Sequence, residues 1–388
     1  MKIVHLLYES QGDPFGVGGA GVRAYEIYKH VKDRHEITLL CKRYPGARDQ
    51  EIEGLRHLYV GAESKSLTKT LLSYAAHSVK FIKKYGTAFD IIIEEFSPPI
   101  PTFLHAFTRQ PLILQVQCNT GSHYFKKYNP VYAAFLVGME RLRPRFYTNL
   151  IAPSPHTAEA LSLRENARVE VIPNGVSPEL LNFSSSEGDY VLYFGRIDPY
   201  SKGLDTLIQA YREFHSSFPG VKLVIAGDGK DRKRFEAMLT RLPAHIKANI
   251  EILGWVSGDR KVEVISQARF VVVPSRHEVQ PISVLEAMAC GKAILVSNIP
   301  ELHAVVEQGA GIAFTAGDPV SLARSMKALA AREDLREMGQ RGRDWVKNYT
   351  WERIALRFEE FLCQVLERES SGRRVEAIGR AGEATKRG

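Results

Sequence analysis

Residues 190–206 read YVLYFGRIDPYSKGLDT, from Tyr190 to Thr206. The first five residues are apolar on both faces, which is typical of a strand covered by helices on both sides. Gly195 and Arg196 come next, Lys202 and Gly203 follow, and a helical pattern starts at Leu204. A strand that passes through a short loop into a helix is the repeating unit of a parallel α/β sheet.

The same unit recurs along the chain in two series. The strands expected in the first series are Ile3–Tyr8, Glu36–Cys41, His57–Val60, Asp90–Glu94, Leu112–Gln117, Asn149–Pro153 and Val169–Ile172. Those of the second series are Tyr190–Phe194, Lys222–Ala226, Ile250–Leu253, Phe270–Pro274 and Ala293–Val296. Helical patterns lie between them. The sequence therefore predicts an α/β protein of two doubly wound, Rossmann-like domains that face a cleft.

The boundary between the two series is a turn. Ile172-Pro173-Asn174-Gly175-Val176 combines a proline with an Asn-Gly pair, and a polar stretch follows over 182–189. We expect an N-terminal domain over 1–175 and a C-terminal domain over 176–350. A helix over 351–367 would return to the N-terminal domain, and the polar segment 368–388 would be a disordered basic tail.

Composition narrows the class of protein. The 388 residues are 44% hydrophobic and 25% charged, which excludes disordered and collagen-like chains. Neither a disulfide framework nor a metal site is expected, because the four cysteines are scattered (Cys41, Cys118, Cys290 and Cys363). The N-terminus lacks a signal-peptide pattern, and no apolar run approaches the ~20 residues of a spanning helix. We expect a cytoplasmic protein.

The net charge of +8 is unevenly distributed. Residues 1–175 carry 22 Lys and Arg against 16 Asp and Glu, whereas 176–388 are close to balance with 30 against 28. No nucleic-acid-binding motif accompanies the excess. Residues 123–147 mix aromatic and basic side chains, which favours contact with an anionic membrane surface or a lipid phosphate. An ordinary loop and a core-facing helix explain the same residues equally well.

A glycine-rich loop precedes the first helical pattern. Gly16-Val17-Gly18-Gly19-Ala20-Gly21 matches G-x-G-x-x-G, the fingerprint of dinucleotide binding. Seven residues separate it from the first strand, and the acid expected after the second strand is missing, so an NAD(P) site is disfavoured. Exposed amides before a helix suit a phosphate. A plain flexible loop remains the alternative.

The second series carries its polar residues after strands. Arg196 and Lys202 bracket one short loop, Gly227-Asp228-Gly229 follows the next strand, and Glu278 and Glu286 stand eight residues apart after the strand at 270–274. The two cations Arg196 and Lys202 could bind one anion, and a carboxylate such as Glu286 could accept hydrogen bonds from two sugar hydroxyls. Each feature alone is more often a solvated surface or a common turn.

Taken together, these motifs resemble the retaining glycosyltransferases of family 4, which have the GT-B fold. The resemblance runs from Gly18-Gly19 to Trp351 and is carried by a set of short motifs. These are the Gly-Gly loop, Pro173-Asn174-Gly175-Val176, Gly195-Arg196 with Lys202-Gly203, Gly227-Asp228-Gly229, Leu253-Gly254-Trp255-Val256 and the E-x7-E element from Glu278 to Glu286.

The resemblance implies a role for each site residue. Arg196 and Lys202 would bind the nucleotide diphosphate and stabilise it as a leaving group, and Glu278 would contact the transferred sugar. On the donor side the implied contacts are Glu286 to the ribose hydroxyls, the Ile282 amide to a phosphate, Val256 beside the base, and Gly18 and Gly19 over the diphosphate.

Two positions depart from the family pattern. Pro281 stands where members often have glycine, which removes one amide. Gln117 occupies the place of a histidine that many members carry near the sugar, and His123 lies further along. A histidine contact to the sugar or acceptor is therefore not expected at that place.

The implied reaction is transfer of a hexose from a nucleotide-diphosphate sugar, with retention, to a glycan, lipid-linked or small-molecule acceptor. No cofactor and no metal are expected, since the sequence lacks a D-x-D motif and the two cations suit the leaving group. We find no protein nucleophile and favour a front-face mechanism. The alternatives are a GT-B-fold sugar-nucleotide epimerase, a phosphorylase, and a non-catalytic sugar-nucleotide-binding protein.

Overall fold

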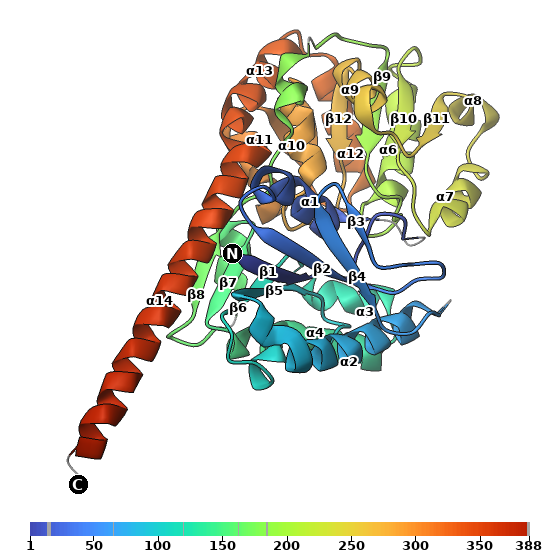
Figure 1. Ribbon diagram of the computed structural model, residues 1–388. Coiled ribbons are helices and arrows are strands. Elements are labelled where there is room, and N and C mark those ends of the chain that lie inside the picture. Colours follow the sequence, from blue (N-terminus) through green and yellow to red (C-terminus); the bar gives the residue numbers. More distant parts are fainter. Residues whose placement is uncertain (14–16, 65, 119, 162, 184, 386–388) are drawn as a thin grey trace. The chain divides into compact units, whose positions relative to one another are not determined.

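The computed structural model describes residues 1–13, 17–64, 66–118, 120–161, 163–183 and 185–385, with side chains as far as Ser371. The chain forms two compact units (Figure 1). Unit 1 comprises Met1–Pro173 and Trp351–Gly388, and unit 2 comprises Asn174–Thr350. The chain changes units at Pro173–Asn174, within the turn that the sequence marks.

Unit 1 contains an eight-stranded sheet in the order β3-β4-β2-β1-β5-β6-β7-β8. All neighbours are parallel except the β3–β4 pair at the edge. The strands are β1 (Lys2–Leu6), β2 (Glu36–Lys42), β3 (Gln50–Ile52), β4 (Leu55–Val60), β5 (Ile91–Phe96), β6 (Leu112–Val116), β7 (Asn149–Ala152) and β8 (Arg168–Val171). Strand β3, which is short, polar and mostly exposed, is not predicted from the sequence.

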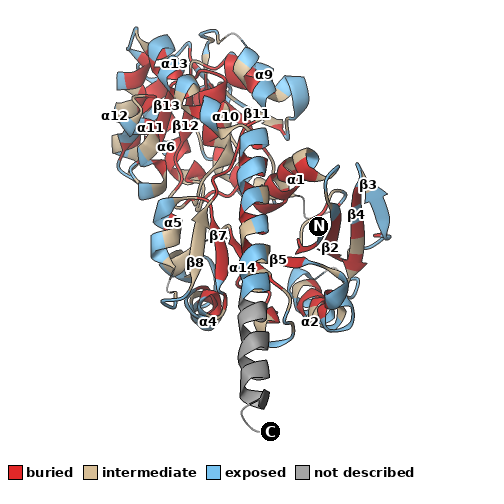
Figure 2. Cartoon of the chain, turned by 60° about the vertical axis from the view of Figure 1, so that its left-hand side comes forward, coloured by how far each residue is buried: buried red, intermediate tan, exposed pale blue. Residues whose placement is uncertain are grey.

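The helices of unit 1 are α1 (Gly19–Val31), α2 (Leu67–Tyr85), α3 (Tyr124–Lys127), α4 (Pro130–Leu142), α5 (Pro155–Ala160) and α14 (Trp351–Thr385). The central strands β1 and β5 are almost wholly buried, as parallel strands between helical layers should be. In Figure 2 buried residues concentrate on the strands and on the inward faces of the helices.

Helix α14 packs on α1. Its buried side chains recur at helical spacing, from Trp351 through Ile354 and Phe358 to Val365, and the Phe358 ring meets Tyr28 of α1 edge-on at 6.0 Å. The helix then continues to Thr385. The sequence predicts a disordered tail over 368–388, and the structure corrects this prediction, because residues 368–385 belong to α14. A segment of polar sequence can still extend a helix that packing has already nucleated.

Unit 2 contains a six-stranded parallel sheet in the order β11-β10-β9-β12-β13-β14. The strands are β9 (Tyr190–Phe194), β10 (Lys222–Ala226), β11 (Ile250–Gly254), β12 (Phe270–Val273), β13 (Ile294–Ser297) and β14 (Gly311–Phe314). The helices are α6 (Leu204–His215), α7 (Arg232–Leu239), α8 (Ala244–Lys247), α9 (Gly258–Ser266), α10 (Ile282–Ala289), α11 (His303–Glu307), α12 (Pro319–Ala330) and α13 (Leu335–Val346). The sequence analysis missed β14.

Both sheets have a switch point where the strand order reverses. In unit 1 it lies between β1 and β5, and in unit 2 between β9 and β12. The chain fills one side of each sheet before it crosses to the other, which makes both units doubly wound as expected. Ligands of such sheets bind beyond the carboxyl ends of the strands at the switch point, so this is where the site is sought.

Candidate functional site

The switch point of unit 2 gathers the residues that the sequence singles out. Arg196 and Lys202 lie in the loop after β9, and Glu278 lies in the loop after the neighbouring β12. Ile282 opens the helix that follows this second loop. The structure therefore brings two cations, a carboxylate and a helix start to one sheet edge.

The loop after β9 is shaped by close backbone approach. Gly203 has φ +65°, and a Cβ at this position would lie 1.8 Å from the carbonyl oxygen of Pro274. Gly227 is equally constrained, since its Cβ would lie 1.8 Å from the Gly195 carbonyl oxygen. Glycine at these two places lets the loops after β9, β10 and β12 pack directly on one another.

Lys202 and Glu278 form an ion pair. Lys202 Nζ donates to Glu278 Oε1 at 2.6 Å, and Ser275 Oγ donates to the same oxygen at 2.7 Å. Glu278 is only 8% exposed, whereas the Lys202 side chain keeps 21% of its surface. The lysine is therefore held in place by a buried carboxylate while part of its side chain stays exposed.

Arg196 is held differently. Its side chain is exposed and makes no hydrogen bond or ion pair within the described ranges. Its backbone is fixed from beneath, because the Tyr193 hydroxyl donates to the Arg196 carbonyl oxygen at 2.7 Å. Burial, and then the nearby Glu278, raise the pKa of Tyr193, so this hydroxyl remains a donor at neutral pH. Arg196 therefore places an exposed cation on a backbone that Tyr193 holds.

The start of α10 offers free amides. The helix begins at Ile282 after Pro281, and no side chain caps it. The first N–H groups of a helix have no intrahelical acceptor, so the Ile282 and Ser283 amides can receive an anion. Asn174 holds the loop that precedes α10, because its backbone N–H donates to Gln280 Oε1 at 2.5 Å and its side-chain amide donates to the Gln280 carbonyl at 2.7 Å.

Glu286 lies one turn into α10 and has a partner that sequence reasoning missed. Lys261 of α9 donates from Nζ to Glu286 Oε1 at 2.6 Å. The pair connects α10 to the segment that carries Val256, which is half-buried after β11. The sequence signal for this contact is Lys261 itself, a basic residue about one turn into the helix that follows Val256.

Arg276 is a second residue that the sequence analysis missed. It forms a two-bond ion pair with Asp205 of α6 at 2.6 and 2.9 Å, and it donates to Thr206 Oγ1 and to the Tyr200 carbonyl. This clamp ties the loop after β12 to the start of α6. Arg276 therefore supports the site, and its place directly after a strand was the signal.

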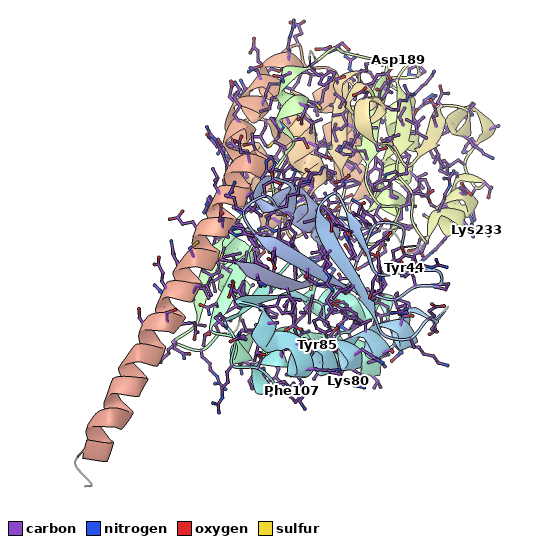
Figure 3. The ribbon with its side chains drawn as sticks, in the orientation of Figure 1. Tyr44, Lys80, Tyr85, Phe107, Asp189 and Lys233 are labelled. Atoms are coloured by element: carbon purple, nitrogen blue, oxygen red, sulfur yellow. The ribbon has the colours of Figure 1, made fainter. Side chains whose placement is uncertain are left out.

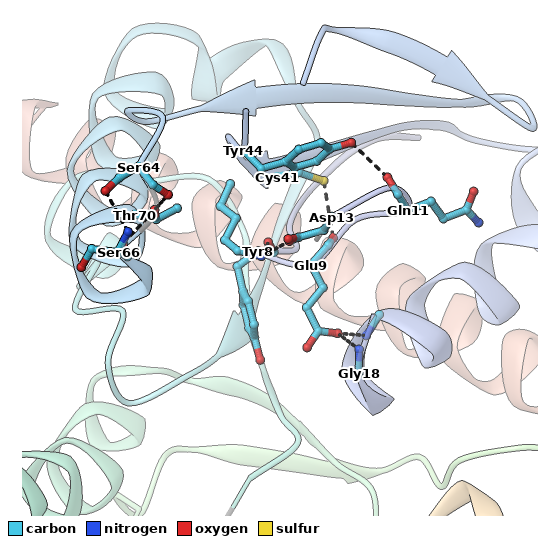
Figure 4. A network of polar contacts seen from close by, with 12 residues as sticks. Tyr8, Glu9, Gln11, Asp13, Gly18, Cys41, Tyr44, Ser64, Ser66 and Thr70 are labelled. Atoms are coloured by element: carbon cyan, nitrogen blue, oxygen red, sulfur yellow. Dashed lines mark hydrogen bonds and ion pairs between the residues drawn. The ribbon is translucent and has the colours of Figure 1, made fainter. Parts of the chain in front are cut away.

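The glycine-rich loop of unit 1 is already contacted by a carboxyl group of the same unit. Glu9, just after β1, accepts hydrogen bonds at Oε2 from the amides of Gly18 and Gly21, at 2.9 and 2.8 Å (Figure 4). Gly16, the first glycine of the motif, lies outside the described residues. Burial raises the pKa of Glu9, although the two amides lower it in part. The Gly18 amide therefore has an internal acceptor, which the expected contact to a diphosphate has to displace, whereas Gly19 has open space beside it.

The residue in the place of the family histidine follows β6. The Gln117 side-chain nitrogen is buried and has no hydrogen-bond partner within the described part of unit 1. His123 lies in a short turn of 3-10 helix over Gly121–His123. Of the two, Gln117 is the one with an unused donor at the carboxyl edge of the sheet.

The described residues offer neither a metal-binding cluster nor a membrane-spanning helix. No three His, Cys, Asp or Glu side chains in that part of the chain are grouped as a metal site. No helix there is both long enough and apolar enough to pass through a bilayer. The expectation of a metal-independent, cofactor-free reaction stays a prediction.

Comparison with known families matches each unit to one family model. The model of glycosyl transferases group 1 matches residues 182–345, and that of glycosyltransferase family 4 matches residues 17–180. The two matches together cover most of the chain. They divide it close to the boundary between the two units.

Individual proteins match parts of the chain. An uncharacterized glycosyltransferase of Methanocaldococcus jannaschii is 31% identical over 211 residues, which are 53% of this chain and 57% of that protein. Phosphatidyl-myo-inositol mannosyltransferase of Mycobacterium leprae is 30% identical over 193 residues, 47% of this chain and 50% of that protein. The chain thus spans about half the length of these curated relatives.

A solved structure matches at the level of the fold. HepE of Anabaena, in complex with UDP-glucose, has a TM-score of 0.72 and 20% identity, over 94% of this chain and all of that one (100%). With the two family models, this places both α/β units in one known architecture. The two family models and the fold together identify the chain as a GT-B, family 4-like glycosyltransferase.

Proposed function

We propose that the protein transfers a hexose from a nucleotide-diphosphate sugar to a glycan, lipid-linked or small-molecule acceptor, with retention of configuration. The observation that carries the proposal is the gathering of Arg196, Lys202, Glu278 and the uncapped start of α10 at the switch point of unit 2. The crystal structure of HepE with UDP-glucose supports a donor of this chemical class.

In the proposed reaction the departing diphosphate gains negative charge as the sugar–oxygen bond breaks. Arg196 and Lys202 stabilise that charge, and the Ile282 amide adds a neutral donor at the start of α10. Fixed donors aimed at developing charge are usually the largest single contribution to catalysis. Because Glu278 already holds Lys202, the lysine needs little reordering when the charge appears.

Glu278 has a second task in this proposal. Its Oε1 atom is engaged by Lys202 and Ser275, which leaves the other oxygen to accept from a hydroxyl of the transferred sugar. Glu286 accepts from the ribose diol after exchanging part of its contact with Lys261. Val256 lies beside the base. Pro281 supplies no amide, so the phosphate site has one donor fewer than in relatives with glycine there.

On the acceptor side, the residues of unit 1 stand at its own switch point. Gly19 has open space where a Cβ would stand, so a ligand can approach its backbone closely. Gly18 would contact the diphosphate only after Glu9 moves, and the unused Gln117 nitrogen suits a sugar hydroxyl. We propose a front-face mechanism in which the leaving phosphate takes the acceptor proton. We also propose that the protein works at the inner face of an anionic membrane.

The proposal is tested by product analysis. The protein is incubated with UDP-, GDP- and ADP-hexoses, each alone and with glycan and lipid-linked acceptors. We expect transfer from one donor and a product with the anomeric configuration of that donor. Conversion of the donor without any acceptor would favour an epimerase, and binding without turnover would favour a non-catalytic protein.

A matched pair of variants separates the site from the surface. Arg196→Ala removes the proposed leaving-group cation, and Arg212→Ala removes another exposed arginine of unit 2, on α6. We expect turnover to fall about 100-fold or more in the first variant and to stay near wild type in the second. Normal transfer by the Arg196 variant contradicts the proposal.

A further inference from the structure

Helix α2 of unit 1 presents an unusual outward face. The helix contains no Asp or Glu, and four exposed lysines lie along it: Lys69, Lys80, Lys83 and Lys84. It also exposes large apolar side chains, with Leu72 at 51% and Tyr85 at 46% of their full surface. Such a combination of apolar side chains and lysines is typical of a surface that meets a membrane.

A hollow of about 430 Å³ opens on this face. Ala75, Ala76 and Val79 of α2 line one side, and Pro101, Phe103 and Phe107 line the other. The volume lies within the range of about 300–1,000 Å³ of small-ligand sites. The two alanines make the hollow, because larger side chains at their positions would fill it.

The far wall of the hollow is rigid. Thr102 donates to the buried carboxylate of Glu94, and Arg143 donates to Thr102 Oγ1 at 2.9 Å. Phe103, the next residue, has φ +47°, a left-handed conformation that a bulky residue adopts only when its surroundings impose it. The hollow therefore exists before any ligand arrives.

One lysine contacts the wall of the hollow, since Lys83 Nζ lies 4.6 Å from the centre of the Phe107 ring. Next to it on α2, Lys84 Nζ lies 4.8 Å from the centre of the Tyr85 ring. Figure 3 shows Tyr85, Lys80 and Phe107 close together on this side of unit 1. An apolar hollow with lysines beside it suits a molecule with an aliphatic chain and a negative head.

The surroundings carry the same character. Between residues 67 and 147, Asp90 is the one exposed carboxylate of the described residues, since Glu94, Glu95 and Glu140 are buried. The segment α3–α4 adds exposed apolar side chains, namely Phe125, Tyr128, Val131, Phe135 and Leu142. The charge of this region complements an anionic bilayer, to which each lysine adds about 1 kcal/mol of attraction.

We propose that the hollow between α2 and residues 101–107 binds one aliphatic chain of an anionic phospholipid and thereby docks unit 1 on a bilayer. The inference deepens the proposed function, because it names the membrane partner of the acceptor-side unit. The lipid chain enters between Ala76 and Phe103, and the head group meets Lys80 and Lys83. Lipid binding itself requires no glycosyl transfer.

The test is vesicle co-sedimentation of the full chain with two lipid compositions, phosphatidylcholine alone and phosphatidylcholine with phosphatidylglycerol. We expect binding to the anionic vesicles only. Ala76→Phe fills the hollow but also adds apolar surface. If the hollow binds the lipid chain, the variant should bind vesicles about tenfold more weakly. If surface hydrophobicity alone drives binding, the variant should bind more strongly. Ala237→Phe, on the exposed side of α7, is the matched control and should bind as wild type.

Charge is tested by a second matched pair. Lys80→Gln with Lys83→Gln should weaken binding to anionic vesicles about tenfold or more, and Lys230→Gln with Lys233→Gln in unit 2 should not. Wild-type protein is also exposed to vesicles that contain a phospholipid with a photoreactive acyl chain. Crosslinks are expected within residues 67–85 or 101–107, and this readout does not depend on any variant folding.

Three results overturn the inference: equal binding to neutral and anionic vesicles, undiminished binding by a folded Ala76→Phe protein, or crosslinks confined to other segments. Nucleoside-diphosphate binding, followed by thermal shift, should be equal in all of these variants. If the lipid experiment fails while a nucleoside diphosphate still binds, the lipid inference is wrong and the proposed function stands. If wild type binds lipid but no nucleoside diphosphate, the proposed function is refuted and the lipid inference stands.

Discussion

Replacing Lys202 with methionine should cost both stability and turnover, and the two losses can be separated. The change leaves Glu278 buried without its cation, although Ser275 still donates to it. A hydrogen bond to a charged group contributes about 1.5–3 kcal/mol. For a unit of this size, each 1 kcal/mol lowers the melting temperature by about 2–4 °C. We therefore expect unit 2 to melt about 3–12 °C lower.

The partner change should be milder. Glu278→Gln preserves the shape of the side chain and leaves Lys202 with an amide oxygen and with solvent, because the lysine side chain is partly exposed. In the double variant, Lys202→Met with Glu278→Gln, no buried charge remains unpaired. The double variant should therefore recover at least half of the melting temperature that Lys202→Met loses.

Turnover should not recover in the double variant. The developing charge on the diphosphate still lacks its cation, so initial rates at saturating donor should stay about 100–1,000-fold below wild type. The assay pairs calorimetric melting with initial rates for all four proteins. An unchanged melting temperature in Lys202→Met would refute the structural role of the pair, and wild-type turnover in the double variant would refute the catalytic role.

Four other predictions concern Arg196, Glu286, Glu9 and Lys292. Arg196→Ala should leave the free energy of unfolding within about 0.5 kcal/mol of wild type, since the side chain is exposed, while nucleotide binding weakens. Wild type should prefer a ribonucleoside diphosphate to its 2′-deoxy form in calorimetric titration, and Glu286→Ala should lose that preference. Glu9→Ala frees the two amides at the start of α1 and should cost about 0.5–2 kcal/mol in denaturant unfolding. Burial lowers the pKa of Lys292 to about 8. Between about pH 8 and pH 10 the unfolded chain therefore binds up to one more proton than the folded chain, and the free energy of unfolding should rise by up to 1.4 kcal/mol per pH unit. Lys292→Met should lose about that slope.

Each of these predictions has an opposite outcome. A large loss of stability in Arg196→Ala would mean that the side chain holds the loop. Equal binding of the two nucleotides by wild type would remove Glu286 from the ribose. An unchanged unfolding energy in Glu9→Ala would show that the amides find other acceptors. The same pH slope in Lys292→Met and wild type would assign the slope to other groups.

The alternation of strands and helices and the place of the site are predictable from sequence, because both depend on local patterns. The strand Tyr190–Phe194 and the start of α6 at Leu204 agree with the structure, so Arg196 and Lys202 lie in a loop at the carboxyl edge. Strands β3 and β14 were missed because short segments that contain polar residues or glycine give a weak periodic signal.

The pairing of the site residues is not predictable from local patterns. Lys202 and Glu278 meet only because β9 and β12 are neighbours in the sheet, and Lys261 meets Glu286 only because α9 lies beside α10. Such contacts depend on strand order. The contact of Glu9 with the glycine loop has a sequence signal, which is an acid shortly after β1. The contact itself depends on how the chain folds back between Glu9 and Gly18, which are nine positions apart, and this is not visible in the sequence.

The central claim is that the switch point of unit 2 binds the diphosphate of a nucleotide sugar. It is tested most directly by calorimetric titration of wild type and of Arg196→Ala with UDP, GDP and ADP. We predict that at least one nucleoside diphosphate binds to wild type and that the variant binds it about tenfold more weakly or worse. Equal affinity of the two proteins, or no binding of any of the three nucleotides to wild type, would contradict the claim.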